Sequence, residues 1–373
     1  MPITIFISGD YAPTLRVNDA IERGDYQSLF NDIIPIINES DIAITNLEFP
    51  LIDNGSPIAK TGPNRKSPVK SIEAIKFAGF DMVTMANNHI MDYGEDGLLS
   101  SIQLCEKNSI RHIGAGNNID EAKRIEYFDV QEKKIAFINC CENEWSTTHG
   151  ETPGCSPLDE VSLFYQIQEA KSTADYVILI IHGGHEMYEY PSPRMKKLYR
   201  WFVDLGVDAV IGHHTHCYSG NEIYKGKPIV YSLGNFVFDS NRRGSLWNIG
   251  CAIVLSLDDK NVDVRLYPFR QCDNEIGVHL LKGEDFNKWE DDNKETTRII
   301  QNDVLLEKQF SSFIEAKEND YLIRLEPFSS RIALWILSKG LCPRFIKRKK
   351  RLSYLNIFRA ESHRDVVLRV LSE

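Results

Sequence analysis

Short apolar runs rich in β-branched residues alternate, up to about residue 282, with longer segments whose apolar positions recur every three or four residues. The short runs are typical of buried strands, and the longer segments are typical of amphipathic helices. This alternation predicts an α/β fold. The predicted parallel strands are residues 3–8, 42–45, 82–85, 176–181 and 209–211, and the predicted helices are residues 67–77, 95–106, 158–171 and 194–205.

Two further sets of apolar runs are too close together to enclose a helix, and they predict antiparallel strands added to the sheet. The first set is residues 124–130 with 134–139, and the second joins residues 229–233 to 252–257 and 262–268. A mixed sheet system with helices on its outside is therefore expected.

The pattern changes after Cys272 to long, charged segments of helical period. Residues 286–318 and 329–338 predict helices, and a cluster of basic side chains follows. We therefore place a boundary near residue 282, which gives one domain over residues 1–282 and a C-terminal helical extension over residues 283–373. This extension either forms an independent appendage or packs back on the first domain.

Composition narrows the class of protein. With 373 residues and 42% hydrophobic content, the chain can bury a substantial core. Its net charge of -10 argues against a nucleic-acid-binding protein, because affinity for the phosphate backbone needs surplus Lys and Arg. No signal peptide is evident, and no segment approaches the ~20 apolar residues that span a bilayer. A cytoplasmic protein is expected.

Five predicted strands lead directly into side chains that can bind a metal ion. In open α/β sheets ligands bind beyond the carboxyl ends of the strands, so the five ends are expected to converge on one site. Carboxylates, an amide oxygen and imidazoles suit Mn²⁺, Fe²⁺ or Zn²⁺, and one or two such ions are expected. In chain order these side chains are Asp10, Asn46, Glu48, Asn87, Asn88, His89, His182, His185, Glu186, His213, His214 and His216.

Each of the five strand ends that carry these side chains also has, taken alone, an ordinary structural explanation. A lone Asp after a strand usually forms a turn or a helix cap, and an Asn pair can do the same. Three histidines within residues 213–216 are harder to explain by core packing. If that segment is extended, His214 and His216 lie on one face and Thr215 faces away. The conjunction of five segments favours the metal site.

Two other residues are weaker candidates. Asn235 ends an apolar run and could orient a group in the site, although a tight turn explains it equally well. Arg65 lies in a loop after the Glu48 strand and could bind an anionic substrate group, although an ordinary solvated loop is slightly favoured.

The order and spacing of these motifs resemble the bacterial capsule-synthesis proteins related to the poly-γ-glutamate synthesis protein CapA. The resemblance covers about residues 3–240. That family is similar in turn to the calcineurin-like metallophosphoesterases, which implies a four-layer sandwich of two mixed β-sheets between helices. The motifs that carry it are Gly9-Asp10, Asn46-Leu47-Glu48, Asn87-Asn88-His89 with Asp92 and Gly94, His182 to Glu186, Gly212 to His216, and Tyr231 to Phe238.

The resemblance also implies a role for each residue. One metal ion would be held by Asp10 and His216, a second by Asn88, His182 and His214, with Glu48 as the bridge. His89 would be the general acid, and Asp92, Asn46 or His213 would orient imidazoles. The phosphoesterases usually have a histidine at the position of Ala12 and an aspartate as the bridge, so His185 or Glu186 would compensate.

The implied function is metal-assisted hydrolysis or transfer on a phosphate ester or related anionic substrate in capsule or exopolymer biosynthesis. Two alternatives stay open: a non-catalytic subunit that binds an anionic polymer or an exopolymer synthase complex, and a metal-dependent γ-glutamyl amide hydrolase.

The family is commonly membrane-anchored, whereas the first strand here is predicted to begin at residue 3, so no N-terminal anchor is expected. The basic run at residues 344–351, close to an apolar segment with Trp335, suits peripheral contact with the inner membrane face. Packing of that apolar segment on the first domain is the favoured alternative.

Overall fold

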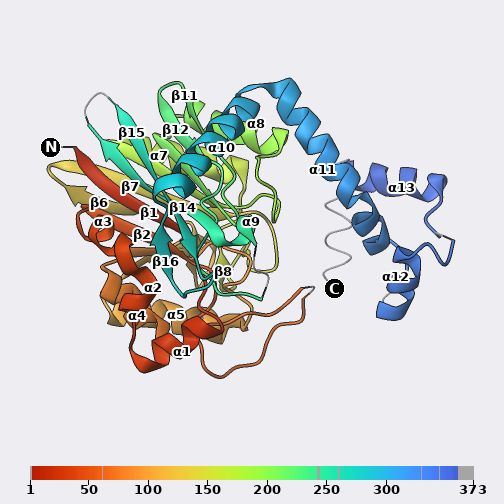
Figure 1. The fold of residues 1–373 in the computed structure, drawn as a ribbon, viewed down its shortest axis with the longest axis horizontal. Coiled ribbons are helices and arrows are strands. Elements are labelled where there is room, and N and C mark those ends of the chain that lie inside the picture. Colours follow the sequence, from red (N-terminus) through yellow and green to blue (C-terminus); the bar gives the residue numbers. More distant parts are fainter. Residues whose placement is uncertain are drawn as a thin grey trace. The chain divides into compact units, whose positions relative to one another are not determined.

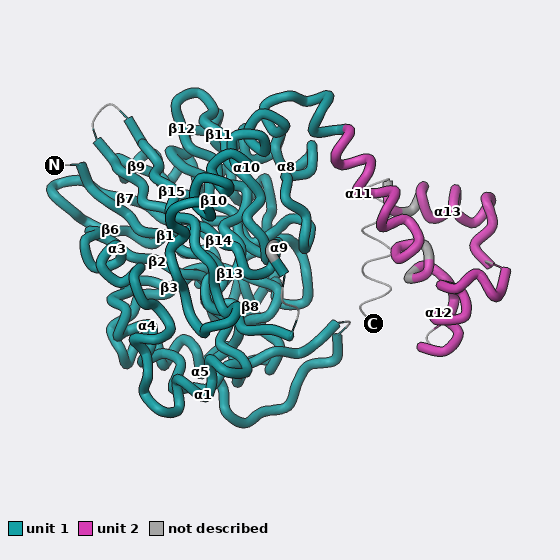
Figure 2. The backbone as a smooth tube through the Cα atoms, viewed as in Figure 1, with its two compact units in different colours: residues 1–307 teal, residues 308–373 magenta. Residues whose placement is uncertain are grey.

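The computed structural model describes residues 2–60, 62–241, 244–258, 261–328, 330–343 and 345–359. The chain divides into two compact units, residues 1–307 and 308–373 (Figure 2). Helix α10 (Gly283–Gln301), which the sequence analysis assigned to the C-terminal extension, lies within unit 1. A domain boundary near residue 282 stays a prediction.

The first sheet of unit 1 has parallel strands in one half and antiparallel strands in the other (Figure 1). Its order is β16-β15-β14-β1-β2-β3-β4, and β13 pairs with the end of β1. The strands are β1 (Ile3–Tyr11), β2 (Ile42–Leu47), β3 (Met82–Thr84), β4 (Arg111–Ile113), β13 (Asn235–Val237), β14 (Ile249–Leu257), β15 (Val262–Gln271) and β16 (Val278–Leu280).

The second sheet has the order β11-β12-β10-β9-β7-β6, with the four strands β12, β10, β9 and β7 parallel. A separate two-stranded sheet joins β5 (Ala115–Gly116) to β8 (Gly154–Cys155). The strands of the second sheet are β6 (Glu126–Val130), β7 (Lys133–Cys141), β9 (Tyr176–His182), β10 (Ala209–His213), β11 (Asn221–Tyr224) and β12 (Lys227–Val230).

One predicted set of antiparallel strands is confirmed and the other is partly wrong. β6 and β7 form the expected hairpin, and so do β14 and β15. However, β12 pairs with β10 and β11 in the second sheet, so it does not join the β14–β15 hairpin. The short and polar strand β11 shows no strand pattern in the sequence, and for that reason the partner of β12 was missed.

Helices cover the outer face of each sheet, which produces the predicted four-layer sandwich. In β1, Ile5 and Ile7 face the second sheet, whereas Phe6 between them faces the helices on the other side. The first sheet is covered by α1 (Arg16–Arg23), α4 (Ser71–Ala78) and α5 (Gly94–Lys107), and the second by α7 (Glu160–Thr173) and α8 (Pro193–Asp204). Short helices are α2 (Gln27–Phe30), α3 (Ile34–Asn38), α6 (Ile119–Ala122) and α9 (Ser245–Asn248).

The four predicted helices are confirmed with small shifts at their ends. α7 begins after Asp159, whose carboxylate accepts a hydrogen bond from the backbone N–H of Ser162 at 2.7 Å. α8 begins after Ser192, which caps the helix in the same way, and Pro193 occupies the first helical position.

The long helix predicted over residues 286–318 is interrupted. α10 ends at Gln301, and α11 (Asp303–Arg324) begins after Asn302, whose backbone is extended. The Asn302 side chain accepts hydrogen bonds from the backbone N–H groups of Val304 and Leu305, both at 3.1 Å. Asn302 therefore starts a new helix, because its side chain satisfies donors that an uninterrupted helix would bond to carbonyl oxygens.

Unit 2 continues α11 and adds α12 (Arg331–Ser338) and α13 (Arg348–Arg359). The buried Glu326 carboxylate accepts hydrogen bonds from the backbone N–H groups of Phe345 and Ile346, which ties the segment before α13 to the end of α11. Arg344 and residues 360–373 of the predicted extension lie outside the described residues. Among the helices that the structure describes, none combines the length and apolar character that a membrane span requires.

Candidate metal centre

Polar side chains from the carboxyl ends of both sheets meet in one buried cluster of unit 1. The fold explains this, because the two sheets face one another with their parallel strands ending at the same edge. Exposed fractions in the cluster run from 0% to 8%. The first sheet supplies Asp10, Glu48 and Asn88, which lie at the ends of β1, β2 and β3, and the second sheet supplies His182, His214 and His216, which lie at the ends of β9 and β10.

The first of two donor groups consists of Asp10, Glu48 and His216, whose ligand atoms all lie within 4.8 Å of one another. His216 Nδ1 is 3.6 Å from Asp10 Oδ2, and His216 Nε2 is 3.8 Å from Glu48 Oε1. Asn235 Oδ1 lies 3.0 Å from His216 Nδ1 and accepts its hydrogen bond when that nitrogen is protonated. In the neutral ring this bond leaves Nε2, which faces Glu48, with the free lone pair that a metal ion needs.

Three of the four carboxylate oxygens of this group are buried without a hydrogen-bond partner among the described residues. They are Asp10 Oδ2 and both carboxylate oxygens of Glu48. Burial and the neighbouring charge of Asp10 raise the pKa of Glu48 well above its ordinary value. Although burial opposes it, the charge of Glu48 and contact with Asp10 raise the pKa of His216 to about 9. Unpartnered buried carboxylates are unfavourable, and a divalent cation among these oxygens would satisfy them.

The second donor group consists of Asn88, His182 and His214. His182 Nε2 lies 3.0 Å from Asn88 Oδ1 and also 3.0 Å from His214 Nδ1. Donor atoms around one tetrahedral zinc ion, each bound at about 2.1 Å, lie about 3.4 Å apart, so these three atoms are close to ligand spacing. Burial and the charge of His214 lower the pKa of His182 well below its ordinary value, which favours the neutral imidazole that metals bind.

Asn46 connects the two donor groups. Its amide nitrogen donates to Asp10 Oδ1 at 2.8 Å and lies 3.4 Å from His182 Nδ1. Its amide oxygen accepts a hydrogen bond from the Thr84 hydroxyl at 3.2 Å, and Asn87 donates to the same oxygen at 3.4 Å. Because all of these atoms are buried, the orientation of the Asn46 amide is fixed between the groups.

His89 stands outside both donor groups and is oriented by Asp92. His89 Nδ1 lies 2.6 Å from Asp92 Oδ2, so Nε2 is the ring nitrogen left to act elsewhere. Burial lowers the pKa of His89, and the adjacent Asp92 carboxylate opposes that shift. The side chain of Asn87 stabilises the turn that contains His89. Its amide oxygen accepts hydrogen bonds from the backbone N–H groups of His89 and Ile90 at 3.1 and 2.9 Å.

Lys60 is a residue of this site that the sequence analysis missed. Its ammonium contacts the Asp92 carboxylate and lies 3.3 Å from His89 Nδ1, and its side chain is 3% exposed. The backbone N–H of Arg65 donates to the same carboxylate at 2.6 Å. A lysine in a polar loop carries no sequence signal for burial beside a histidine, so only the folded loop reveals it.

The other candidate residues lie at the margin of the site. His213 Nε2 is 3.1 Å from the carbonyl oxygen of Ser8, which directs this ring to the backbone of β1. His185 is half-buried in the loop after β9, and Glu186 is exposed, although its charge acts on both Glu48 and His216. The side chain of Arg65 is exposed, and the structure brings only its backbone to the site.

The backbone around the paired histidines is not extended, so the predicted geometry of that segment is wrong. β10 ends at His213, and φ is 92° at His214 and 58° at His216. Positive φ is unfavourable for residues with a Cβ and persists where the surrounding structure enforces it. The two rings nevertheless approach within 6.2 Å of each other, through a tight turn.

An apolar wall stands beside His216. It consists of Ala12, Phe49, Phe238 and Trp247, and the Trp247 ring lies 5.0 Å from the ring of His216. Ala12, at the position where the phosphoesterases usually have a histidine, is fully buried in this wall. Its methyl group therefore contributes packing there and no metal ligand.

The four layers, together with a buried carboxylate and imidazole cluster at the strand ends, define a protein of the metallophosphatase-like structural class. The chain belongs to the family described as "Bacterial capsule synthesis protein PGA_cap", which matches residues 4–240. The resemblance stated from the motifs is thereby confirmed.

The names of several similar proteins refer to capsule or polymer synthesis. The chain is 32% identical over 246 residues to "Capsule biosynthesis protein CapA" of Bacillus anthracis, covering 64% of this chain and 60% of that protein. It is 32% identical over 235 residues to "PGA biosynthesis protein CapA" of Bacillus subtilis, covering 62% of each. A "Probable polyglutamine synthesis accessory protein" of Mycobacterium tuberculosis is 25% identical over 242 residues, covering 60% and 63%. The match therefore spans less than two thirds of each relative.

Similar solved structures include a hypothetical protein from Thermus thermophilus, with 15% identity, coverage of 72% of this chain and 99% of that one, and a TM-score of 0.44. The 5'-nucleotidase of Candida albicans has 12% identity, coverage of 84% and 57%, and a TM-score of 0.41. Similarity at this level is too weak to support the fold assignment, which rests on the layers described above.

Proposed function

We propose that this chain is a metal-dependent hydrolase or transferase of capsule or exopolymer biosynthesis, acting on a phosphate ester or related anionic substrate. The observation that carries the proposal is the set of buried, unpartnered carboxylate oxygens of Asp10 and Glu48, with His89 held by Asp92 nearby. The names of the relatives support the biological setting.

The residues divide into metal-binding and proton-transferring roles. Asp10, Glu48 and His216 would hold one cation, and Asn88, His182 and His214 would hold the other, with Mn²⁺, Fe²⁺ or Zn²⁺ best suited to the donors. Bound cations would polarise the scissile group. His89 would donate a proton from Nε2 to the leaving group, and Asp92 would hold the ring in position through Nδ1. Asn46 and Asn235 would orient the metal-binding side chains.

Metal content and substrate profile test this proposal together. Protein purified from metal-supplemented cells is expected to contain at least one transition-metal ion, and hydrolysis of a chromogenic phosphate mono- or diester is expected to stop with chelator and return with Mn²⁺ or Zn²⁺. Absence of metal, with no uptake on titration, contradicts the proposal. Metal without hydrolysis of any ester supports a non-catalytic polymer-binding or synthase-binding subunit, and cleavage of γ-glutamyl amides alone supports the amide hydrolase.

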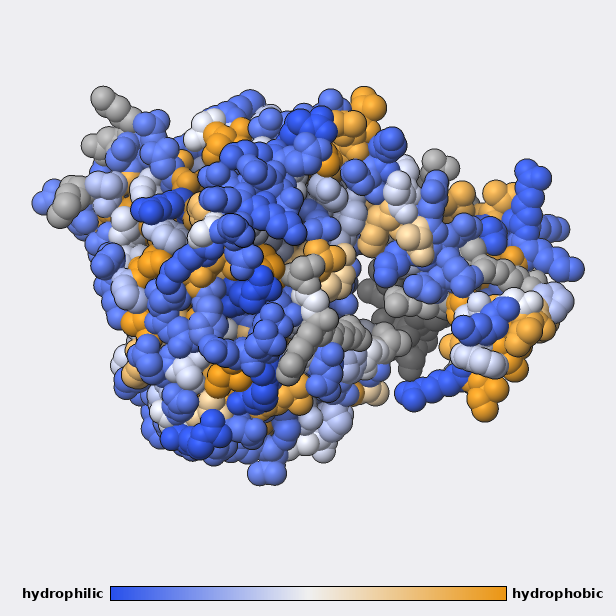
Figure 3. Space-filling view, viewed as in Figure 1, coloured by the Kyte–Doolittle hydropathy of each residue, from blue (hydrophilic) through white to orange (hydrophobic). Residues whose placement is uncertain are grey.

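A membrane contact of unit 2 is a separate proposal about partners and location. Within this unit, Trp335, Leu352, Leu355 and Phe358 are each more than half exposed, so the described part of the unit leaves much of their surface uncovered. Figure 3 shows apolar surface gathered over α12. Basic residues 347–351 directly precede Leu352 at the start of α13. We propose that this surface rests on the anionic inner face of the membrane and brings a cytoplasmic protein to an exopolymer synthase complex.

Vesicle cosedimentation measures this contact. The protein is expected to bind anionic but not neutral vesicles and to be released by high salt, because each basic side chain contributes about 1 kcal/mol at an anionic surface. Replacing Lys347, Arg348, Lys349 and Lys350 by Gln should abolish binding. The control removes the same charge from exposed positions of unit 1, by Gln at Lys76, Lys107, Lys171 and Lys294. Equal binding to anionic and neutral vesicles contradicts the proposal. Equal loss of binding in the unit 2 variant and the unit 1 control also contradicts it.

A further inference from the structure

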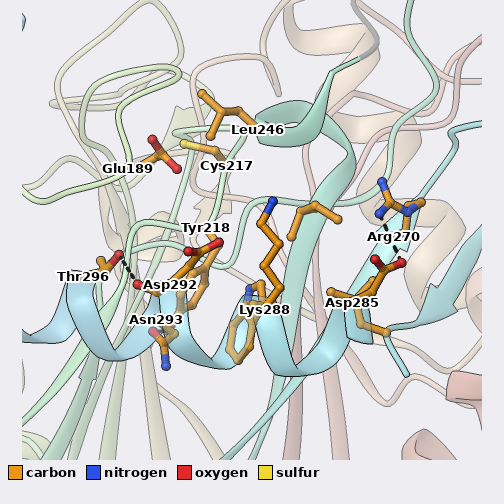
Figure 4. Close-up of a pocket in the computed structure, with 13 residues that line it drawn as sticks. Glu189, Cys217, Tyr218, Leu246, Arg270, Asp285, Lys288, Asp292, Asn293 and Thr296 are labelled. Atoms are coloured by element: carbon orange, nitrogen blue, oxygen red, sulfur yellow. Dashed lines mark hydrogen bonds and ion pairs between the residues drawn. The ribbon is translucent and has the colours of Figure 1, made fainter. Parts of the chain in front are cut away.

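A pocket of about 240 Å³ lies in unit 1, outside the metal centre, with α10 along one side (Figure 4). Its lining combines side chains of α10 with Arg270 of β15, Cys217 and Tyr218 after β10, and Leu246 of α9. None of these residues is among the proposed metal ligands.

The pocket is nevertheless built on the same segments as the metal centre. Cys217 directly follows His216, and Leu246 directly precedes Trp247, whose ring packs 5.0 Å from that of His216. Glu189, from the loop after β9, also lines the pocket. The first two of these segments thus each place one side chain in the metal centre or its wall and the adjacent one in the pocket.

Opposite charges are separated within the pocket. Figure 4 shows Glu189 and Asp292 toward one end, Arg270 paired with Asp285 at the other, and the Lys288 side chain rising between them. Lys288, Glu189 and Asp292 have no ion-pair partner among the described residues, whereas Arg270 lies 3.6 Å from each of the carboxylates of Asp273 and Asp285. Burial and the neighbouring charge of Asp292 raise the pKa of Glu189.

Aromatic side chains give the pocket a rigid floor. The rings of Tyr218 and Trp289 lie 5.4 Å apart, and the Tyr218 hydroxyl lies within hydrogen-bond distance of the amide oxygens of Asn221 and Asn293, at 2.9 and 3.0 Å, with one proton to donate to either. These contacts fix the Tyr218 ring against α10. Leu246 and Ile249 add apolar surface. The pocket therefore offers a ligand charged side chains at both ends and apolar side chains between them.

We propose that this pocket binds a small zwitterion, namely a free amino acid whose side chain carries no net charge. The ammonium of the ligand would lie between Glu189 and Asp292, and its carboxylate would contact Lys288 and Arg270. The cavity is smaller than the roughly 300–1,000 Å³ of pockets for drug-sized ligands, which suits a molecule the size of an amino acid. A ligand with both charges uses both ends of the pocket, whereas a simple anion or cation would leave one end unpaired. The proposal does not rest on metal binding.

Calorimetric titration of the full chain with L-leucine and L-glutamine tests the proposal, before and after chelator treatment. At least one of the two is expected to bind in both preparations. The N-acetyl derivative lacks the ammonium and the carboxamide derivative lacks the carboxylate, so each should bind at least tenfold more weakly than its parent. Absence of binding by both amino acids, or equal binding of a parent and its derivatives, overturns the proposal.

Variants locate the binding in this pocket. Lys288→Gln and Asp292→Asn should each weaken binding tenfold or more, and both side chains lie at the surface of α10, where folding tolerates the change. Lys294→Gln is the matched control, because Lys294 lies on the same helix and pairs only with Glu290 and Asp291 within it. Unchanged binding in both Lys288→Gln and Asp292→Asn overturns the assignment, as does an equal loss in Lys294→Gln.

Discussion

Replacement of His89 by asparagine is expected to lower the turnover of a chromogenic phosphate ester by roughly two to four orders of magnitude, the range of a lost general acid, while metal content stays near wild type. The expectation follows from the geometry. His89 lies outside both donor groups, its Nδ1 is occupied by Asp92 at 2.6 Å, and its ring packs against Phe49 at 5.3 Å. Asparagine preserves some polarity and volume but has no group that can transfer a proton near neutral pH.

Metal analysis and steady-state kinetics on the same preparation measure the two quantities. His279→Asn is the control, since His279 is a partly buried histidine of β16, the edge strand of the first sheet, and lies 3.3 Å from Asn31 rather than in either donor group. Loss of metal in His89→Asn as large as the loss in turnover would make His89 a ligand. Unchanged turnover would remove it from the reaction.

Replacement of His182 by alanine is expected to weaken metal binding by more than the roughly 10–100-fold that loss of an outer partner causes. His182 is the central member of its group, since its Nε2 lies 3.0 Å from both Asn88 and His214. Removing the imidazole deletes a donor that is 1% exposed, and no neighbouring side chain is placed to replace it.

Titration with Mn²⁺ or Zn²⁺, followed by elemental analysis, gives the affinity. His112→Ala is the matched control, because it removes an imidazole of similar burial from β4, at the opposite edge of the first sheet from β16. If both variants lose metal equally, the loss reflects general destabilisation. If His182→Ala keeps wild-type affinity, the second donor group is not a metal site.

The sequence predicts the location of the site well because the location depends on local signals. Apolar runs that end in Asp10, Glu48 or His182 are visible directly, and the rule that ligands gather beyond parallel strand ends supplies their convergence. The same signals predict the sandwich, since alternating faces such as Ile5, Phe6 and Ile7 need apolar partners on both sides. The roles of these residues stay predictions.

Features that depend on contacts between distant segments were not predictable. The left-handed backbone at His214 and His216 is imposed by the surrounding fold, whereas the spacing of the two histidines is equally compatible with an extended chain. Burial of Lys60 against Asp92 depends on how a long loop folds back, and no periodicity marks it. The zwitterion pocket depends on α10 lying along the sheet, which a helical pattern alone does not place.

The proposed ligands come from two stretches of chain separated by more than ninety residues, from Asp10 to Asn88 and from His182 to His216. Each donor group takes members from both stretches. A nascent chain therefore carries no complete group until residue 214 has left the ribosome and the second sheet has docked on the first. Contacts so far apart in sequence form late in folding. Cations bound here would therefore slow unfolding of the finished protein much more than they would hasten its folding.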